Sequence, residues 1–215
     1  AIARHGFANS GQFCYRVNRC YVERPVYEDF LAKLKCHVDK LKVGDGFDAS
    51  CAMGPLVNEK IYANSERQSD DARNKGARIL TGGKRLTGGL YDGGWFFPPT
   101  LIADADHSML VMTEETFGPV LGIMPFDDRR EALKLANQTR YGLAGFVFSE
   151  NLATALTLAE GIEAGSVWVN NIHRSSHTMP FGGMKESGFG REKGRFGIEA
   201  YLEYKSIYLS YKESL

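Results

Sequence analysis

A cysteine in a glycine-containing turn is the feature of this chain that best supports chemistry. It is Cys14, the last residue of the segment NSGQFC at positions 9–14. A thiolate is a strong nucleophile and adds readily to a carbonyl carbon. Gly11 lets the backbone bend closely, so the amide of Cys14 can point at an oxygen that forms on that carbon. Taken alone, the segment favours a structural thiol, because most single cysteines are buried without chemistry.

Two later segments carry residues that suit ligand binding. Residues 114–120 read EETFGPV, and residues 180–188 read PFGGMKESG. The carboxylate of Glu115 can accept two hydrogen bonds from a vicinal diol, and the glycines after Phe181 let a loop approach a ligand closely. The alternative is a solvated acidic pair in the first segment and a core aromatic beside a turn in the second.

In wording, order and spacing, the three segments together resemble the aldehyde dehydrogenase superfamily, from about residue 9 to residue 211. The resemblance implies the catalytic domain of an NAD- or NADP-dependent enzyme that oxidises an aldehyde to a carboxylic acid through a thioester on Cys14. It implies that Glu115, Phe117 and Phe181 bind the cofactor, and it implies no metal site. In the family, the general base and an asparagine that meets the oxyanion precede these segments, as does the dinucleotide-binding domain.

The family varies its substrate pocket in the loop that corresponds to residues 171–177. The resemblance implies substrate contacts from Phe13, Arg174, Ser176 and Phe181. Ser176 matches a serine that holds the substrate carboxylate in succinate semialdehyde dehydrogenases, and Arg174 can add charge-assisted recognition. A semialdehyde substrate is therefore expected.

The chain departs from those enzymes at two places beside the nucleophile. Ala8 stands where they carry an arginine, and Tyr15 and Arg16 follow Cys14 where they often place a second cysteine. Arg16 is a candidate for the missing charge, although side-chain direction cannot be read from sequence.

Three other functions remain open from the sequence. An acylating dehydrogenase would pass the thioester to coenzyme A, and a catalytically incomplete domain would have no activity of its own. A cysteine hydrolase would use His5 as its base, but no strand-turn-helix elbow surrounds Cys14. Because Cys14 comes so soon after the first residue, an upstream half is expected to be missing from this chain, and the fragment is expected to be inactive alone.

Composition excludes several other classes. The 215 residues include 26 basic and 26 acidic side chains, so no net field favours nucleic acid or anionic membrane. No apolar run approaches the ~20 residues of a membrane helix, and no signal-peptide pattern opens the chain. The four cysteines form no CxxC pair or zinc spacing, and Cys20 and Cys36 are expected in the core. We expect a cytoplasmic protein whose partner is a small aldehyde.

Strands that alternate with helices predict an α/β fold, a three-layer domain with a largely parallel sheet over residues 1–215. Helices are predicted at 26–41, 59–75, 127–137, 151–162 and 191–200, and strands at 19–23, 78–80, 120–126, 143–148 and 166–170. The run 95–102 contains two prolines and predicts at best an edge strand. A last strand at about 201–209 has uncovered apolar surface, which predicts a homodimer or homotetramer.

Overall fold

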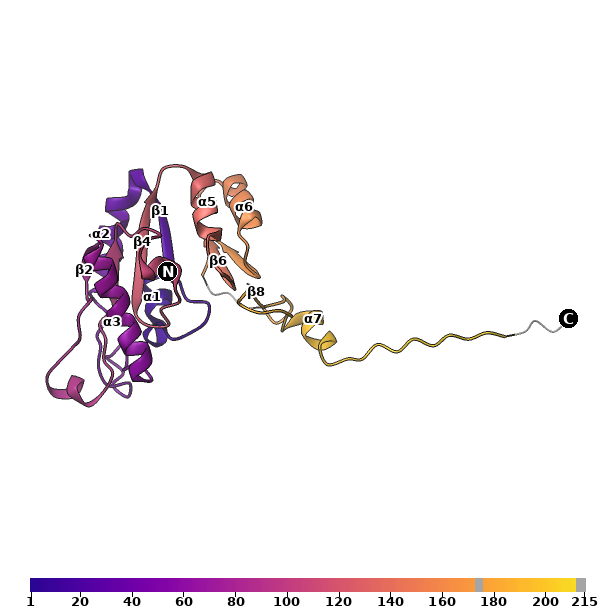
Figure 1. The fold of residues 1–215 in the computed structure, drawn as a ribbon, viewed down its shortest axis with the longest axis horizontal. Helices are drawn as coiled ribbons and strands as arrows, with labels where there is room; N and C mark the ends of the chain where they lie inside the picture. Colours follow the sequence, from indigo (N-terminus) through magenta and orange to yellow (C-terminus); the bar gives the residue numbers. More distant parts are fainter. Residues whose placement is uncertain (173–175, 212–215) are drawn as a thin grey trace.

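A computed structural model of the chain describes residues 1–172 and 176–211. Its main body is built on a four-stranded sheet with the order β1-β4-β3-β2 (Figure 1). β4 pairs in parallel with both β1 and β3, and β2 is antiparallel to β3. The strands are β1 (Arg19–Glu23), β2 (Arg78–Thr81), β3 (Thr100–Ala103) and β4 (Val120–Phe126).

Helices cover both faces of this sheet. Alternate residues of its central strands point to opposite sides, so apolar side chains must be buried on each face. Leu101 and Leu121 join one buried cluster with α1 (Ile2–Phe7) and α2 (Tyr27–Val38). Ile102 and Val120 join the other with α3 (Glu59–Asn74) and α4 (Leu110–Thr113). The expected three-layer α/β architecture is confirmed for the main body.

The remaining elements form a second group beside the first (Figure 1). β6 (Ala144–Val147) pairs in parallel with β7 (Ser166–Val169), and α5 (Arg129–Asn137) and α6 (Leu152–Gly161) lie side by side above them. β5 (Tyr141–Gly142) pairs antiparallel with β8 (Met184–Lys185), and α7 (Gly194–Glu199) follows. The other elements in the described residues are the left-handed turn η1 (Ala8–Gly11) and the short helices η2 (Arg24–Val26) and η3 (Gly89–Gly93).

Two expectations about the main body are wrong. The run 95–102 does not give an edge strand: β3 begins after the prolines and lies between β4 and β2. The prolines are accommodated because the ladder starts at Thr100, whose amide donates to the carbonyl of Pro119 at 2.8 Å. Cys36 is exposed on α2 and not in the core, since the buried face of that helix carries Tyr27, Leu31, Leu34 and Val38.

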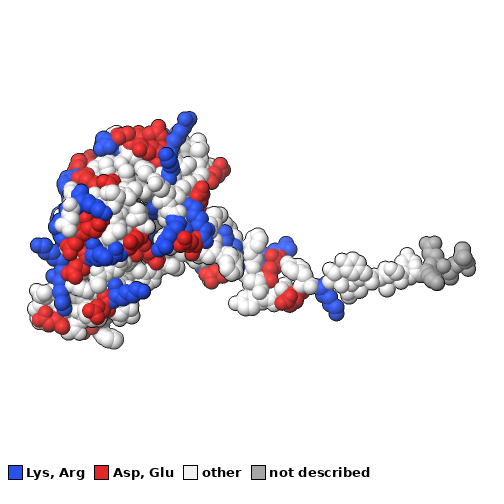
Figure 2. Space-filling view, viewed as in Figure 1, with Lys and Arg blue, Asp and Glu red and all other residues white. Residues whose placement is uncertain are grey.

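The expected last strand is not formed within one chain. Residues 201–211 belong to no strand, and the segment runs away from the body as an extended tail. Figure 2 shows charged side chains interspersed over the body and a largely uncharged tail. The exposed apolar residues on it are Tyr201, Leu202, Tyr204, Ile207, Tyr208, Leu209 and Tyr211. A strand needs a partner, and this chain places none beside the tail, so pairing with another chain stays a prediction.

Candidate active site

Cys14 follows a turn made of three consecutive left-handed residues. Asn9, Ser10 and Gly11 have φ angles of 49°, 56° and 76°. Such backbone costs energy for the two residues that are not glycine and persists only where its surroundings fix it. Here the Ser10 hydroxyl donates to the carbonyl of Gly54 at 2.8 Å, and the Asn9 side chain donates to the carbonyl of Gln12 at 3.0 Å. The turn is thereby fixed, and it leaves Cys14 exposed.

The turn packs directly on the segment that contains Glu115 and Phe117. A side chain on Gly11 would place its Cβ 2.7 Å from the carbonyl carbon of Gly118, and closer still to its oxygen. Only glycine allows this approach of two backbones. As a result Cys14, Glu115 and Phe117 line one cavity of about 320 Å³.

The loop between α4 and β4 is held by side chains of α3. The Asn64 amide donates to the carbonyls of Glu115 at 3.2 Å and Thr116 at 3.0 Å. The Thr116 hydroxyl is buried and donates to the Gln68 side chain at 2.6 Å. These bonds hold Phe117 at a φ of 51°, a backbone conformation that is uncommon for a bulky residue.

The two neighbouring glutamates of this loop have different surroundings. Glu114 forms an ion pair with Arg67 of α3. Glu115 is exposed at the cavity. Of the two carboxylates, Glu115 is therefore the better placed to bind a ligand in the cavity.

Arg16 has a different environment from the one expected of a substrate-binding charge. It is 7% exposed, and its guanidinium donates to the carbonyls of Gly118 at 2.7 Å and Val120 at 2.6 Å. Burial lowers its pKa to about 9, while the charge of Glu115 acts to raise it, so the group stays protonated at neutral pH. The sequence identified the position but gave no sign of these backbone contacts.

An aromatic cluster surrounds Tyr15, the residue after Cys14. Tyr15 makes edge-to-face contacts with Phe13 at 5.3 Å and with Phe181 at 5.5 Å between ring centroids. Trp168 of β7 stacks on Tyr15 at 6.2 Å. Phe13 and Phe181 thus both contact the residue next to Cys14, although neither lines the cavity that Glu115 and Phe117 line.

Of the two polar residues predicted to contact the substrate, the structure describes Ser176, which does not line the cavity. Arg174 lies outside the described residues. Ser176 is exposed, and its hydroxyl is hydrogen-bonded with that of Thr178 at 2.8 Å. Its role in carboxylate recognition remains a prediction.

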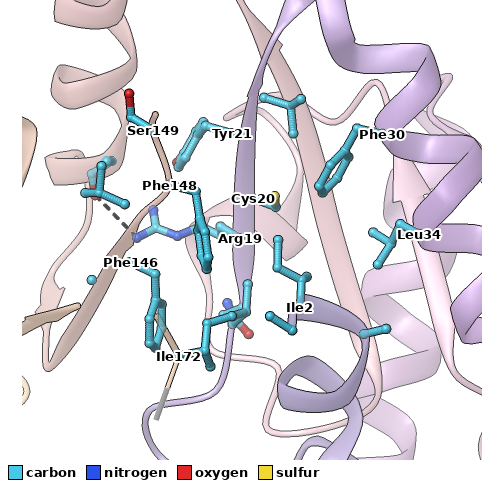
Figure 3. A pocket seen from close by; sticks show the side chains of 18 of the residues that line it. Ile2, Arg19, Cys20, Tyr21, Phe30, Leu34, Phe146, Phe148, Ser149 and Ile172 are labelled. Carbon is cyan, nitrogen blue, oxygen red and sulfur yellow. Dashed lines mark hydrogen bonds between the residues drawn. The ribbon is translucent and has the colours of Figure 1, made fainter. Parts of the chain in front are cut away.

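A larger cavity of about 1550 Å³ lies between β1 and β6 and does not include Cys14. Figure 3 shows apolar side chains on both sides, with Phe146 and Phe148 facing Cys20, Phe30 and Leu34. Its thiol, Cys20, is buried, and burial raises the pKa of that thiol to about 12, so this cavity offers hydrophobic surface without a reactive thiolate. The smaller cavity is therefore the better candidate active site.

Neither a metal cluster nor a membrane-spanning helix is found in the parts of the chain that the structure describes. Residues 1–172 and 176–211 contain no group of three or more His, Cys, Asp or Glu side chains that could hold a metal ion. Within the same residues, no helix is long and apolar enough to cross a membrane.

Comparisons with known proteins show the family of the chain. Residues 1–207 match the model of the aldehyde dehydrogenase family. The chain is 43% identical to succinate semialdehyde dehydrogenase of Acinetobacter baylyi over 93% of its length, and 44% identical to mitochondrial succinate-semialdehyde dehydrogenase of Mus musculus over 94%. It covers 40% and 38% of those relatives, so it spans about two-fifths of their length.

Solved structures show the same likeness. Betaine aldehyde dehydrogenase of Staphylococcus aureus in complex with NAD⁺ superposes with a TM-score of 0.88 at 40% identity, over 94% of this chain and 42% of that one. A 3,6-anhydro-L-galactose dehydrogenase in complex with NAP gives a TM-score of 0.93 at 36% identity, over 98% of this chain and 44% of that one. The chain belongs to the aldehyde dehydrogenase family.

Proposed function

We propose that this chain carries the nucleophile and the nicotinamide-side surface of an NAD(P)-dependent aldehyde dehydrogenase. One observation supports this most strongly: the thiol of Cys14 and the side chains of Glu115 and Phe117 line a single cavity. The close approach of Gly11 to Gly118 brings them together, although they are far apart in the sequence.

The residues at this cavity fit part of a nicotinamide cofactor. The exposed carboxylate of Glu115 can accept hydrogen bonds from the two hydroxyls of a ribose, and the half-buried ring of Phe117 offers an apolar face beside it. A volume of about 320 Å³ suits the nicotinamide and its ribose better than a whole dinucleotide. Bound there, NAD(P) would be the two-electron oxidant and would accept the hydride that leaves the aldehyde carbon.

Cys14 acts as nucleophile and later as leaving group. Its thiolate adds to the aldehyde carbon, and the oxyanion that forms can be met by its own amide. After oxidation the acyl group is held on sulfur as a thioester, and water cleaves the carbon–sulfur bond to give the acid and free thiol. The exposed position of Cys14 after a fixed turn suits both steps.

An activated ester tests the nucleophile without any cofactor. The chain is mixed with p-nitrophenyl acetate, and acylation is followed by release of nitrophenolate and by peptide mapping. We expect one rapid equivalent of nitrophenolate, lost in Cys14→Ser. The matched control is Cys36→Ser, which removes the other exposed thiol and should leave the burst unchanged. Acylation at Cys36 as fast as at Cys14 would refute the assignment.

For the substrate, we propose a semialdehyde that carries a carboxylate. The support is the likeness to succinate-semialdehyde dehydrogenases and the exposed hydroxyl of Ser176 in the loop after β7. Succinic semialdehyde should protect Cys14 from iodoacetamide at lower concentration than butanal does, because the two differ in the carboxylate. Ser176→Ala should narrow that difference. Equal protection of the native chain by the two aldehydes would contradict the proposal.

A further inference from the structure

The buried guanidinium beside the nucleophile is a feature that the chemistry above does not use. We propose that Arg16 is a positioning residue that fixes the spacing between Cys14 and the ligand-binding side chains of Glu115 and Phe117. This inference rests on the proposed function, since the spacing matters only if those residues share one reaction site.

The contacts of Arg16 join the two parts of the site. It lies two residues after Cys14, and it donates to the carbonyls of Gly118 and Val120, at the point where the loop enters β4. The same guanidinium donates to the side chain of Asn18 at 3.2 Å. Asn18 in turn donates to the carbonyl of Glu114 at 3.4 Å. The segment just after the nucleophile therefore holds the loop 114–120 at both ends.

A role in packing alone explains Arg16 poorly. Burying a guanidinium removes its hydration, and a well-packed apolar residue of similar size often gives equal or greater stability. The charge of Glu115 acts to raise the pKa of Arg16, but that carboxylate is exposed. The guanidinium of Arg16 donates instead to oxygens of Gly118, Val120 and Asn18. What arginine offers here is a planar fork that donates to two carbonyls in fixed positions, which the single ammonium of lysine cannot reproduce.

The experiment compares Arg16→Met and Arg16→Lys with a matched control. The control is Arg24→Met, which removes an exposed guanidinium that pairs with Asp127 at 2.7 Å. Hydrogen exchange is measured at the amides of Thr100 and Val120, because their acceptors are the carbonyls of Pro119 and Gly118 in the loop. Each variant is also alkylated at Cys14 with and without a high concentration of NAD.

We expect both Arg16 variants to speed exchange at these two amides about tenfold or more, since methionine loses both charge-assisted hydrogen bonds to the loop and lysine cannot make both. Amides of β1 should keep their protection, and the effect of NAD on Cys14 alkylation should shrink. The control should match the native chain. Unchanged exchange in Arg16→Met, or full rescue by Arg16→Lys, would overturn the proposal, because neither outcome is compatible with a required fork.

Two further outcomes are informative. If Arg16→Met loses protection throughout the sheet, Asn18→Ala decides: it breaks the link to Glu114 without removing a charge. Faster hydrogen exchange at the Val120 amide of Asn18→Ala supports the proposal that the segment after Cys14 holds the loop. An exchange rate equal to that of the native chain overturns it. If NAD does not change the rate of Cys14 alkylation in the native chain, the proposed cofactor site is contradicted. The hydrogen-exchange rates alone decide whether Arg16 holds the loop.

Discussion

Replacing Gly11 with alanine tests the contact that assembles the candidate site. Gly11 has a φ of 76°, and a left-handed conformation costs a non-glycine residue roughly 1–2 kcal/mol. The added Cβ would also lie 2.7 Å from the carbonyl carbon of Gly118, so backbone must move. Overpacking of this kind typically costs about 1–3 kcal/mol. We expect Gly11→Ala to lower the free energy of unfolding by about 2–5 kcal/mol in total.

Gly76→Ala is the matched control because it separates the cost of the left-handed backbone from the cost of the close contact with Gly118. Gly76 has a φ of 91°, but its added Cβ would meet no atom within 4 Å. It should therefore cost only the conformational term, about 1–2 kcal/mol. Alanine also reduces the entropy of the unfolded chain in both variants, and this contribution cancels when they are compared.

Urea unfolding followed by tryptophan fluorescence gives both values. The slope of each transition must match that of the native chain for the comparison to hold. Cys14 alkylation is measured in parallel, since a displaced turn should change its rate in Gly11→Ala but not in Gly76→Ala. Equal destabilisation by the two substitutions would refute the direct backbone contact between the turn and the loop.

Four other outcomes are expected. Asn58→Ala should lower the free energy of unfolding by about 1 kcal/mol in urea titrations, because the Asn58 side chain caps α3 by accepting from the amide of Ile61 at 3.0 Å; an unchanged midpoint would contradict the cap. Burial raises the pKa of Cys20 from 9.0 to about 12, so the contribution of the protonated thiol to stability is complete below pH 9.0 and is lost as the pH rises toward about 12. Cys20→Val should flatten the curve of unfolding free energy against pH in that range, and an unchanged curve would contradict the raised pKa. A chain that ends at Ala200 should sediment as a smaller species than the full chain, and identical profiles would exclude assembly through the tail. The purified chain should not reduce NAD with an aldehyde, because its cavity of about 320 Å³ holds only part of the cofactor; reduction that disappears in Cys14→Ala would show otherwise.

Local sequence patterns predicted the regular elements well. α2 and α3 follow from apolar residues at helical spacing, and β1 and β4 begin and end at the predicted residues. β3 was misjudged because proline argues against a strand only where an amide must donate, and here both prolines precede the ladder. Which strand lies in the interior depends on pairing between distant segments, and no local pattern contains that information.

The candidate residues of the site come from the family resemblance, whereas the geometry of the site could not be read from the sequence. Resemblance to the family indicated Cys14, Glu115 and Phe117, and the structure places them at one cavity. The direction of the Arg16 side chain could not be predicted, because its carbonyl partners lie in a loop more than a hundred residues away. The exposure of Cys36 was likewise missed, since a cysteine fits either face of a helix.

The uneven distribution of the core has a consequence for how the site opens. Among the described residues after Ala132, the buried hydrophobic side chains are Val147 and Ala155, whereas both large clusters belong to the four-stranded sheet. Regions with few buried contacts open locally at lower free energy than the rest of a protein. Phe181 belongs to this weaker part, and Cys14 and Phe117 belong to the stronger one. We therefore expect Phe181 to separate from the Tyr15 ring in a local opening of lower free energy than any opening of the turn before Cys14.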